Sequence, residues 1–205
     1  MQRSQFPTTL LISILVFVNS SLALTPLRED AEKETLPPVV PIHRYVNLTR
    51  YSGLWYEQAR IPIPYTTGCD CSTALYEFKP ERKVVEVTNT CNYINGTSVP
   101  GYFVGESRNR NNTELFVKQK TPPYIGGDYW ILDLGETQDY GYALIGDPER
   151  STLWILSRVE VLGEDRIEQL LKRARDLGYD TSRVKRDPVK KCFQEDLGGA
   201  KNVLV

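Results

Sequence analysis

The sequence predicts an all-β protein in which eight antiparallel strands close into an up-and-down β-barrel, with one C-terminal α-helix packed outside. Two observations lead to this fold class. Short segments of alternating polar and apolar residues, about eight of them within roughly 110 residues, follow one another between turn residues. The periodicity then changes near the C-terminus to that of an amphipathic helix.

The first segment, residues 1–23, is typical of a secretory signal peptide. An apolar run at 10–18 follows one basic residue, and Ser21-Leu22-Ala23 has the small residues of a cleavage site. The run is too short for a membrane anchor, which needs about 20 apolar residues. We therefore expect a secreted protein without a transmembrane anchor. Three Asn-x-Thr sequons would then be glycosylation acceptors, at Asn47, Asn95 and Asn111.

Residues 24–44 form an acidic, proline-containing leader, which we expect to be flexible or extended. One domain at 45–186 then holds the barrel and the helix. Its predicted strands cover 55–61, 73–79, 84–90, 102–106, 114–119, 129–134, 140–145 and 152–158. Short turns between successive strands favour an up-and-down barrel wide enough for one small ligand, and a β-sandwich is the alternative.

The helix is predicted over 164–177, because its apolar residues recur on one face. Gly178 follows it and can take the left-handed conformation that ends a helix. The tail from Asp180 onward is charged, and we expect it to be irregular, with its last part at 187–205 tethered through Cys192.

Charge and histidine content argue against several function classes. The chain has 25 basic and 26 acidic residues, which gives no sign of the basic stripe that nucleic acid requires. Its one histidine, His43, lies in the leader, so neither a multi-histidine metal site nor a Ser-His-Asp triad is expected. We expect no enzymatic activity, no metal and no cofactor.

Four cysteines follow the signal segment, and an even number in an oxidising compartment indicates two disulfides. Cys69 and Cys71 are one residue apart, which places them poorly for a bridge to each other. Two pairings remain open on the residues alone: Cys71–Cys192 with Cys69–Cys91, or Cys71–Cys91 with Cys69–Cys192.

Three motifs appear in a fixed order along the predicted barrel. They are GLWYE at 53–57, DYGYALIG at 139–146 and LWILSR at 153–158. In their order and spacing they resemble the lipocalin family, most closely the branch of bacterial lipocalin, plant temperature-induced lipocalin and apolipoprotein D. The resemblance covers about 46–186. The chain departs from that branch in having more cysteines near the second strand than the branch pattern requires.

The resemblance implies structural roles for four motif residues: Gly53, Trp55, Tyr140 and Arg158. Trp55 would lie at the closed end of the barrel and Arg158 on the neighbouring last strand. The two can then stack in a cation–π contact of about 0.5–2 kcal/mol. Glu57 has the same parity as Trp55, and we expect it to be a partnered structural carboxylate.

The resemblance also implies a binding cup lined by Tyr76, Asn89, Tyr129 and Trp154. Asn89 continues an inward apolar face, so we expect a buried amide that anchors a ligand. The implied function is secretion, binding and transport of a small hydrophobic ligand: a fatty acid, lysophospholipid, sterol, retinoid or bilin. Contact with a membrane surface or a lipoprotein stays open. The alternatives are an isomerase-like or de-epoxidase-like enzyme and an interaction module acting through the loop at 62–71.

The resemblance decides between the two disulfide pairings. In this branch the cysteine just before the second strand, here Cys71, is bridged to the C-terminal tail. It therefore implies Cys71–Cys192, which leaves Cys69–Cys91 as the second bridge.

Overall fold

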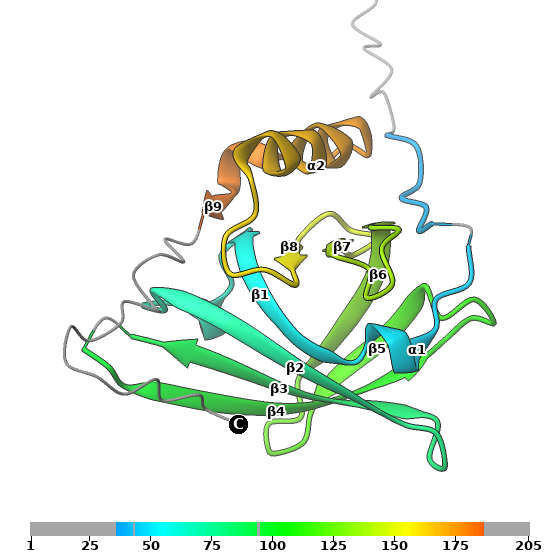
Figure 1. Cartoon of the computed structure of the whole chain (residues 1–205), viewed down its shortest axis with the longest axis vertical. Helices are drawn as coiled ribbons and strands as arrows, with labels where there is room; N and C mark the ends of the chain where they lie inside the picture. The colour runs from blue at the N-terminus through cyan, green and yellow to red at the C-terminus, as the bar shows by residue number, and fades with distance from the viewer. Residues whose placement is uncertain (1–35, 43, 94, 187–205) are drawn as a thin grey trace, which may run out of the picture. The chain divides into compact units, whose positions relative to one another are not determined.

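The computed structural model describes residues 36–42, 44–93 and 95–186. Within them, eight antiparallel strands form a closed barrel, with one further strand and one main helix outside it (Figure 1). The predicted fold class is thus confirmed. The expected signal peptide, most of the leader, His43 and the tail with Cys192 lie outside the described residues.

The eight barrel strands follow the chain around the sheet in the order β2-β3-β4-β5-β6-β7-β8-β1, and a β1–β2 pairing closes the ring. Their bounds are β1 Gly53–Arg60, β2 Cys71–Lys79, β3 Val84–Asn92, β4 Ser98–Ser107, β5 Glu114–Gln119, β6 Gly126–Leu134, β7 Tyr142–Gly146 and β8 Leu153–Ser157. Each corresponds to a predicted strand. The largest extensions are at the starts of β4 and β6, where glycine and proline weaken the strand signal.

Strand β1 is shared between two neighbours. Its first half pairs with β2 and its second half with β8. Beyond Tyr56, where the pairing with β2 ends, β1 also pairs with β9, Lys185–Arg186. A 3₁₀ turn at Thr181–Arg183 leads into β9, so the expectation of an irregular tail is wrong for residues 181–186. These residues are ordered because they pair with the backbone groups of β1 that β2 leaves unpaired.

Helix α2, Glu164–Asp176, packs on the outer face of the barrel. Its buried residues Ile167, Leu170, Leu171 and Ala174 form one cluster with outward-facing residues of β1, β6, β7 and β8. Gly178 has a φ of 84° and follows the helix, as predicted. The Tyr179 hydroxyl then donates to the carbonyl of Asp147 at 2.6 Å, which ties the end of the helix region to the barrel.

The described end of the leader is held against the barrel. Ile42 N donates to the carbonyl of Ile131 at 2.9 Å, and the Arg44 guanidinium donates to the carbonyls of Leu134 and Gly135. The pairing of β5 with β6 ends at Trp130. The part of β6 after Trp130 therefore has backbone carbonyls that can accept hydrogen bonds from the leader. Residues 36–42 and 44 of the leader form no helix or strand, and these contacts fix them against β6. The chain then forms the short helix α1, Leu48–Tyr51, capped by the side chain of Asn47.

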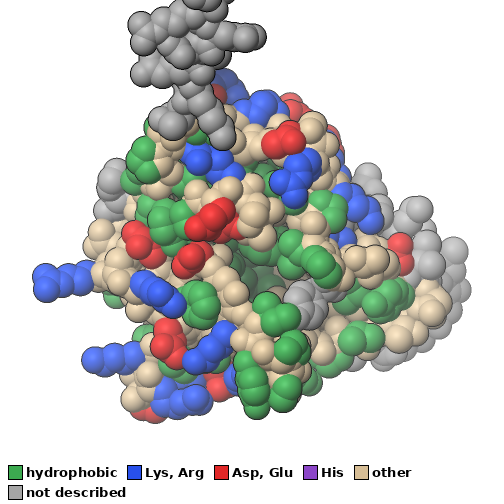
Figure 2. All heavy atoms as spheres, turned by 180° about the vertical axis from the view of Figure 1, so that it is seen from behind, with side chains coloured by type: hydrophobic (Ala, Val, Ile, Leu, Met, Phe, Trp, Pro, Cys, Tyr) green, Lys and Arg blue, Asp and Glu red, His purple; other side chains and the backbone are tan. Residues whose placement is uncertain are grey.

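The surface carries mixed charge. On the face in Figure 2, basic and acidic side chains are interspersed among hydrophobic ones instead of forming a stripe of one sign. Over the described residues, no helix has the length and apolar character needed to cross a membrane.

Candidate ligand-binding site

The closed end of the barrel is built around Trp55, which is fully buried. The guanidinium of Arg158 lies 3.8 Å from the centroid of its ring, the stack that the motifs imply. Arg158 also donates to a set of backbone carbonyls around the start of β1 and the β6–β7 turn: those of Arg50, Tyr51, Ser52, Leu54 and Asp139. These contacts join the two ends of the barrel sheet, so both residues have a structural place.

Tyr140 also has a structural place in this region. Its hydroxyl accepts a hydrogen bond from Asn47 N at 3.0 Å, and the guanidinium of Arg50 lies 4.0 Å from its ring centroid. The buried ring therefore links α1 to the β6–β7 turn, and it belongs to the interior cluster beside Tyr51.

Three tyrosine hydroxyls meet inside the barrel above Trp55. The Tyr129 hydroxyl lies 2.7 Å from that of Tyr51 and 3.1 Å from that of Tyr76. Tyr76 and Tyr129 were predicted to line the cup, whereas Tyr51 was not, because it lies before the first predicted strand at 55–61. Helix α1 turns its side chain inward. The Asn47 cap three residues before Arg50 was the available signal for that turn.

Burial keeps these hydroxyls neutral. It raises the pKa of Tyr76 to about 12 and raises the pKa values of Tyr51 and Tyr129 as well. A cavity of about 10 Å³ beside them has room for about one water molecule. The floor of the barrel is thus closely packed, and space for a ligand has to come from the part nearer the open end.

Trp154 and Asn89 lie nearer that open end. Trp154 is partly buried and packs against the interior cluster of the barrel. Asn89 is opposite Ala74 on an interior-facing position, but its side chain is exposed. The expectation of a buried amide is therefore wrong, because strand parity gives the face of a residue but not its height in the barrel. Val99, also near the mouth, is 50% exposed.

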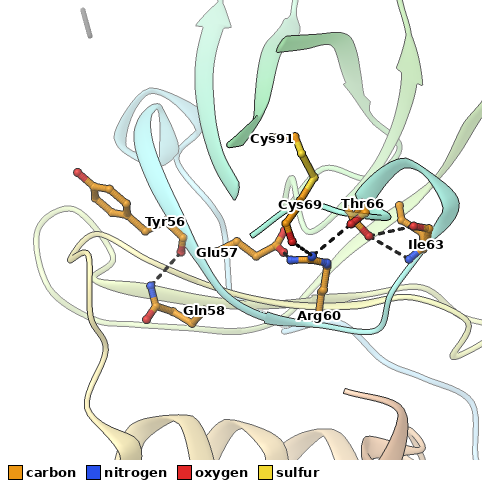
Figure 3. Close-up of polar contacts among 8 residues, drawn as sticks. All are labelled: Tyr56, Glu57, Gln58, Arg60, Ile63, Thr66, Cys69 and Cys91. Carbon is orange, nitrogen blue, oxygen red and sulfur yellow. Dashed lines mark hydrogen bonds and ion pairs between the residues drawn. A yellow bond between two sulfur atoms is a disulfide. The ribbon is translucent and has the colours of Figure 1, made fainter. Parts of the chain in front are cut away.

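An ion pair lies in the wall of the barrel below the first open-end loop, residues 61–70 (Figure 3). Arg60 donates to the carboxylate of Glu57, and both side chains are buried. Nη2 of Arg60 lies 3.4 Å from the carbonyl oxygens of Thr66 and Cys69 in that loop. The expected role of Glu57 as a partnered carboxylate fits this contact.

Sequence reasoning missed Arg60, whose parity differs from that of Glu57. The register of β1 on β8 shifts between Glu57 and Ala59, so Gln58 is an extra residue. The shift brings Arg60 to the interior face as well, opposite Trp154. No local sequence signal marks this bulge.

A disulfide joins Cys69 to Cys91 and fastens the same loop to β3. Cys71 is also disulfide-bonded, and its expected partner, Cys192, lies outside the described residues. None of the described cysteines is free. Within the described chain, no cluster of three or more His, Cys, Asp or Glu could hold a metal.

A larger hollow of about 870 Å³ lies outside the barrel, between α2, the β6–β7 turn and the leader. Its walls include Arg44, Arg166, Asp133 and Glu136, a mixed set of charges. None of the three floor tyrosines lines it, so it is separate from the cup that the motifs imply.

The three sequon asparagines are exposed. Asn47 uses Oδ1 to cap α1 and Asn95 uses Oδ1 to accept from Thr97 N, which leaves the Nδ2 atoms that would carry a glycan outside these bonds. Glycosylation stays a prediction.

Comparison with known proteins places this architecture in a family. A family model described as a lipocalin-like domain matches residues 46–189. The chain belongs to the lipocalin family. Lipocalins typically bind small hydrophobic ligands, and most are binding proteins.

The relatives of this lipocalin agree with the branch that the motifs resemble. It is 33% identical over 150 residues to temperature-induced lipocalin-1 of Arabidopsis thaliana, covering 70% of this chain and 79% of that protein. It is 28% identical over 153 residues to the outer membrane lipoprotein Blc of Escherichia coli, covering 73% and 82%. Among solved structures it resembles insecticyanin from the tobacco hornworm Manduca sexta, with a TM-score of 0.56, 22% identity and coverage of 75% and 85%.

Proposed function

We propose that this lipocalin binds a small hydrophobic ligand in the half of its barrel nearer the open end, and that it carries the ligand outside the cell. The observation that supports this most directly is the lining of the interior. Aromatic and aliphatic side chains form the interior cluster, and Trp154 packs against this cluster from the part of β8 nearer the mouth. An apolar wall with a few polar groups is the usual character of a small-molecule site.

Trp154 is the proposed wall residue of this half, Tyr76 and Tyr129 would form the floor beneath the ligand, and Asn89 would contact a ligand only at the mouth. Transfer of apolar ligand surface out of water is worth about 25 cal/mol per Å² before the costs of association. The proposal of secretion depends on the signal-like residues 1–23. Glycosylation at Asn47, Asn95 and Asn111 in turn depends on secretion. The fatty acid, lysophospholipid, sterol, retinoid and bilin classes are candidates.

Binding of an uncharged fluorescent probe, N-phenyl-1-naphthylamine, tests the proposal. We expect Trp154→Ala to weaken probe binding by about tenfold, since a large apolar contact is lost. Trp130→Ala is the matched control, because Trp130 packs with the cluster under α2 on the outer face. Equal affinities for the two variants, or no binding by the wild type, would count against a barrel site.

A further inference from the structure

Two charged side chains face the barrel interior among the described strand residues. Glu57 is opposite Leu156 and Arg60 is opposite Trp154, and both of these partners belong to or pack against the interior cluster. The interior-facing residues of the other strands are uncharged. Examples are Tyr76 on β2, Val87 on β3 and Tyr129 on β6. The net charge of the described strand residues inside the cup therefore depends on Glu57 and Arg60.

The pair cancels its own charge. Glu57 is 7% exposed and Arg60 is 1% exposed, and the guanidinium donates directly to the carboxylate. The loop carbonyls of Thr66 and Cys69 direct further negative dipole ends at Nη2. Figure 3 shows the carboxylate and both carbonyls converging on this guanidinium. The positive charge is thus already matched by groups of the chain itself.

The remaining polar groups of the interior are neutral. Burial holds the three floor tyrosines in the protonated form well above physiological pH. Arg158, the cation beneath the floor, is engaged by Trp55 and by backbone carbonyls at the closed end. An anion that entered the cup would lose its hydration, would find no uncompensated positive charge, and would lie close to Glu57.

We propose that the barrel interior selects uncharged groups, such as hydroxyl, ester or ketone oxygen on an apolar body, and excludes carboxylate and phosphate. Glu57 is the residue that determines this specificity, because it neutralises Arg60. An amphiphile with one anionic head then binds only with that head at the mouth. This inference rests on the proposed function and narrows its ligand class to molecules whose enclosed part is neutral.

The test uses short ligands that are polar at both ends, so that one end has to enter. Dodecane-1,12-diol and dodecanedioate displace N-phenyl-1-naphthylamine from the full chain at pH 8. We expect the diol to bind at least about tenfold more tightly than the diacid, because burying an unmatched charge is costly. Equal affinities for the wild type would overturn the proposal, and this comparison needs no variant.

Glu57→Gln assigns the effect to its residue. It leaves Arg60 without its carboxylate, so we expect the ratio of diacid affinity to diol affinity to rise about tenfold. Glu77→Gln removes the same charge from an exposed position on β2 and should leave the ratio unchanged. A ratio that is the same in Glu57→Gln and the wild type would overturn the role of Glu57. If neither ligand nor the uncharged probe binds the wild type, the proposed function itself fails.

Discussion

At the residue scale, Gly53 meets two constraints at once. Its φ of 102° lies in the region that favours glycine, and a Cβ there would lie 3.3 Å from Nη1 of Arg158. The close approach of Arg158, in the third motif, therefore explains why the first motif has a glycine at position 53. Both positions serve the closure of the barrel rather than a ligand.

Gly53→Ala should lower the free energy of unfolding by about 1–3 kcal/mol, because of backbone strain and displacement of Arg158. Urea denaturation measures the change. Gly96→Ala is the control, since Gly96 has a φ of 83° but no atom within 4 Å of its Cβ position. A loss no larger than that of the control would show that the Arg158 contact contributes little.

The floor tyrosines make the free energy of unfolding depend on pH in the alkaline range. Below pH 10 the folded and unfolded chains both keep these protons, so stability does not change through them. Between pH 10 and 12 the unfolded chain loses the Tyr76 proton while the folded chain keeps it, so stability falls. Tyr76 alone should account for about 2–3 kcal/mol over this window.

Denaturation from pH 8 to 12, with tyrosinate absorbance at 295 nm, measures this effect. Tyr76→Phe should reduce the loss of stability over this window, whereas Tyr102→Phe, at an exposed position, should leave it unchanged. Tyrosines that all ionise near pH 10 while the chain stays folded would contradict the pKa shift.

Residue-level prediction from the sequence worked where a contact lies between strands whose order is known. The Trp55–Arg158 stack follows from adjacent first and last strands. Asn89 was assigned to the correct face but not to its depth, which depends on tilt and stagger of the whole barrel. Tyr51 and Arg60 were missed because a one-turn helix and a bulge place them.

At the element scale, the strands and α2 were predictable because alternation and helical periodicity are local patterns. The described end of the leader and β9 were not, since each takes up backbone groups that a distant strand leaves unpaired. The first open-end loop is fixed by a similar non-local combination of Arg60 and a disulfide.

Replacing Cys69 and Cys91 by alanine should destabilise the barrel by about 3 kcal/mol in the chain-entropy model, given their separation of 22 residues. Limited proteolysis should cut the loop at 61–70 first, because it loses its covalent link to β3. Unchanged stability together with an uncut loop would show that the Arg60 contacts are sufficient.

At the scale of the whole molecule, the second disulfide would close a much longer loop. Cys71 to Cys192 spans about 120 residues, and the bridge should add roughly 4–5 kcal/mol. Non-reducing peptide mapping should recover the two peptides joined. A free thiol at Cys192 would contradict this pairing.

Strand β9 has a consequence for how copies of the protein behave toward one another. It covers the stretch of β1 that β2 leaves unpaired, at Ala59 and Arg60. A chain that ends at Val184 would present these backbone groups as an open sheet edge, which can add a strand from another molecule. We therefore expect a chain shortened to Val184 to self-associate more readily in concentrated solution than the full chain.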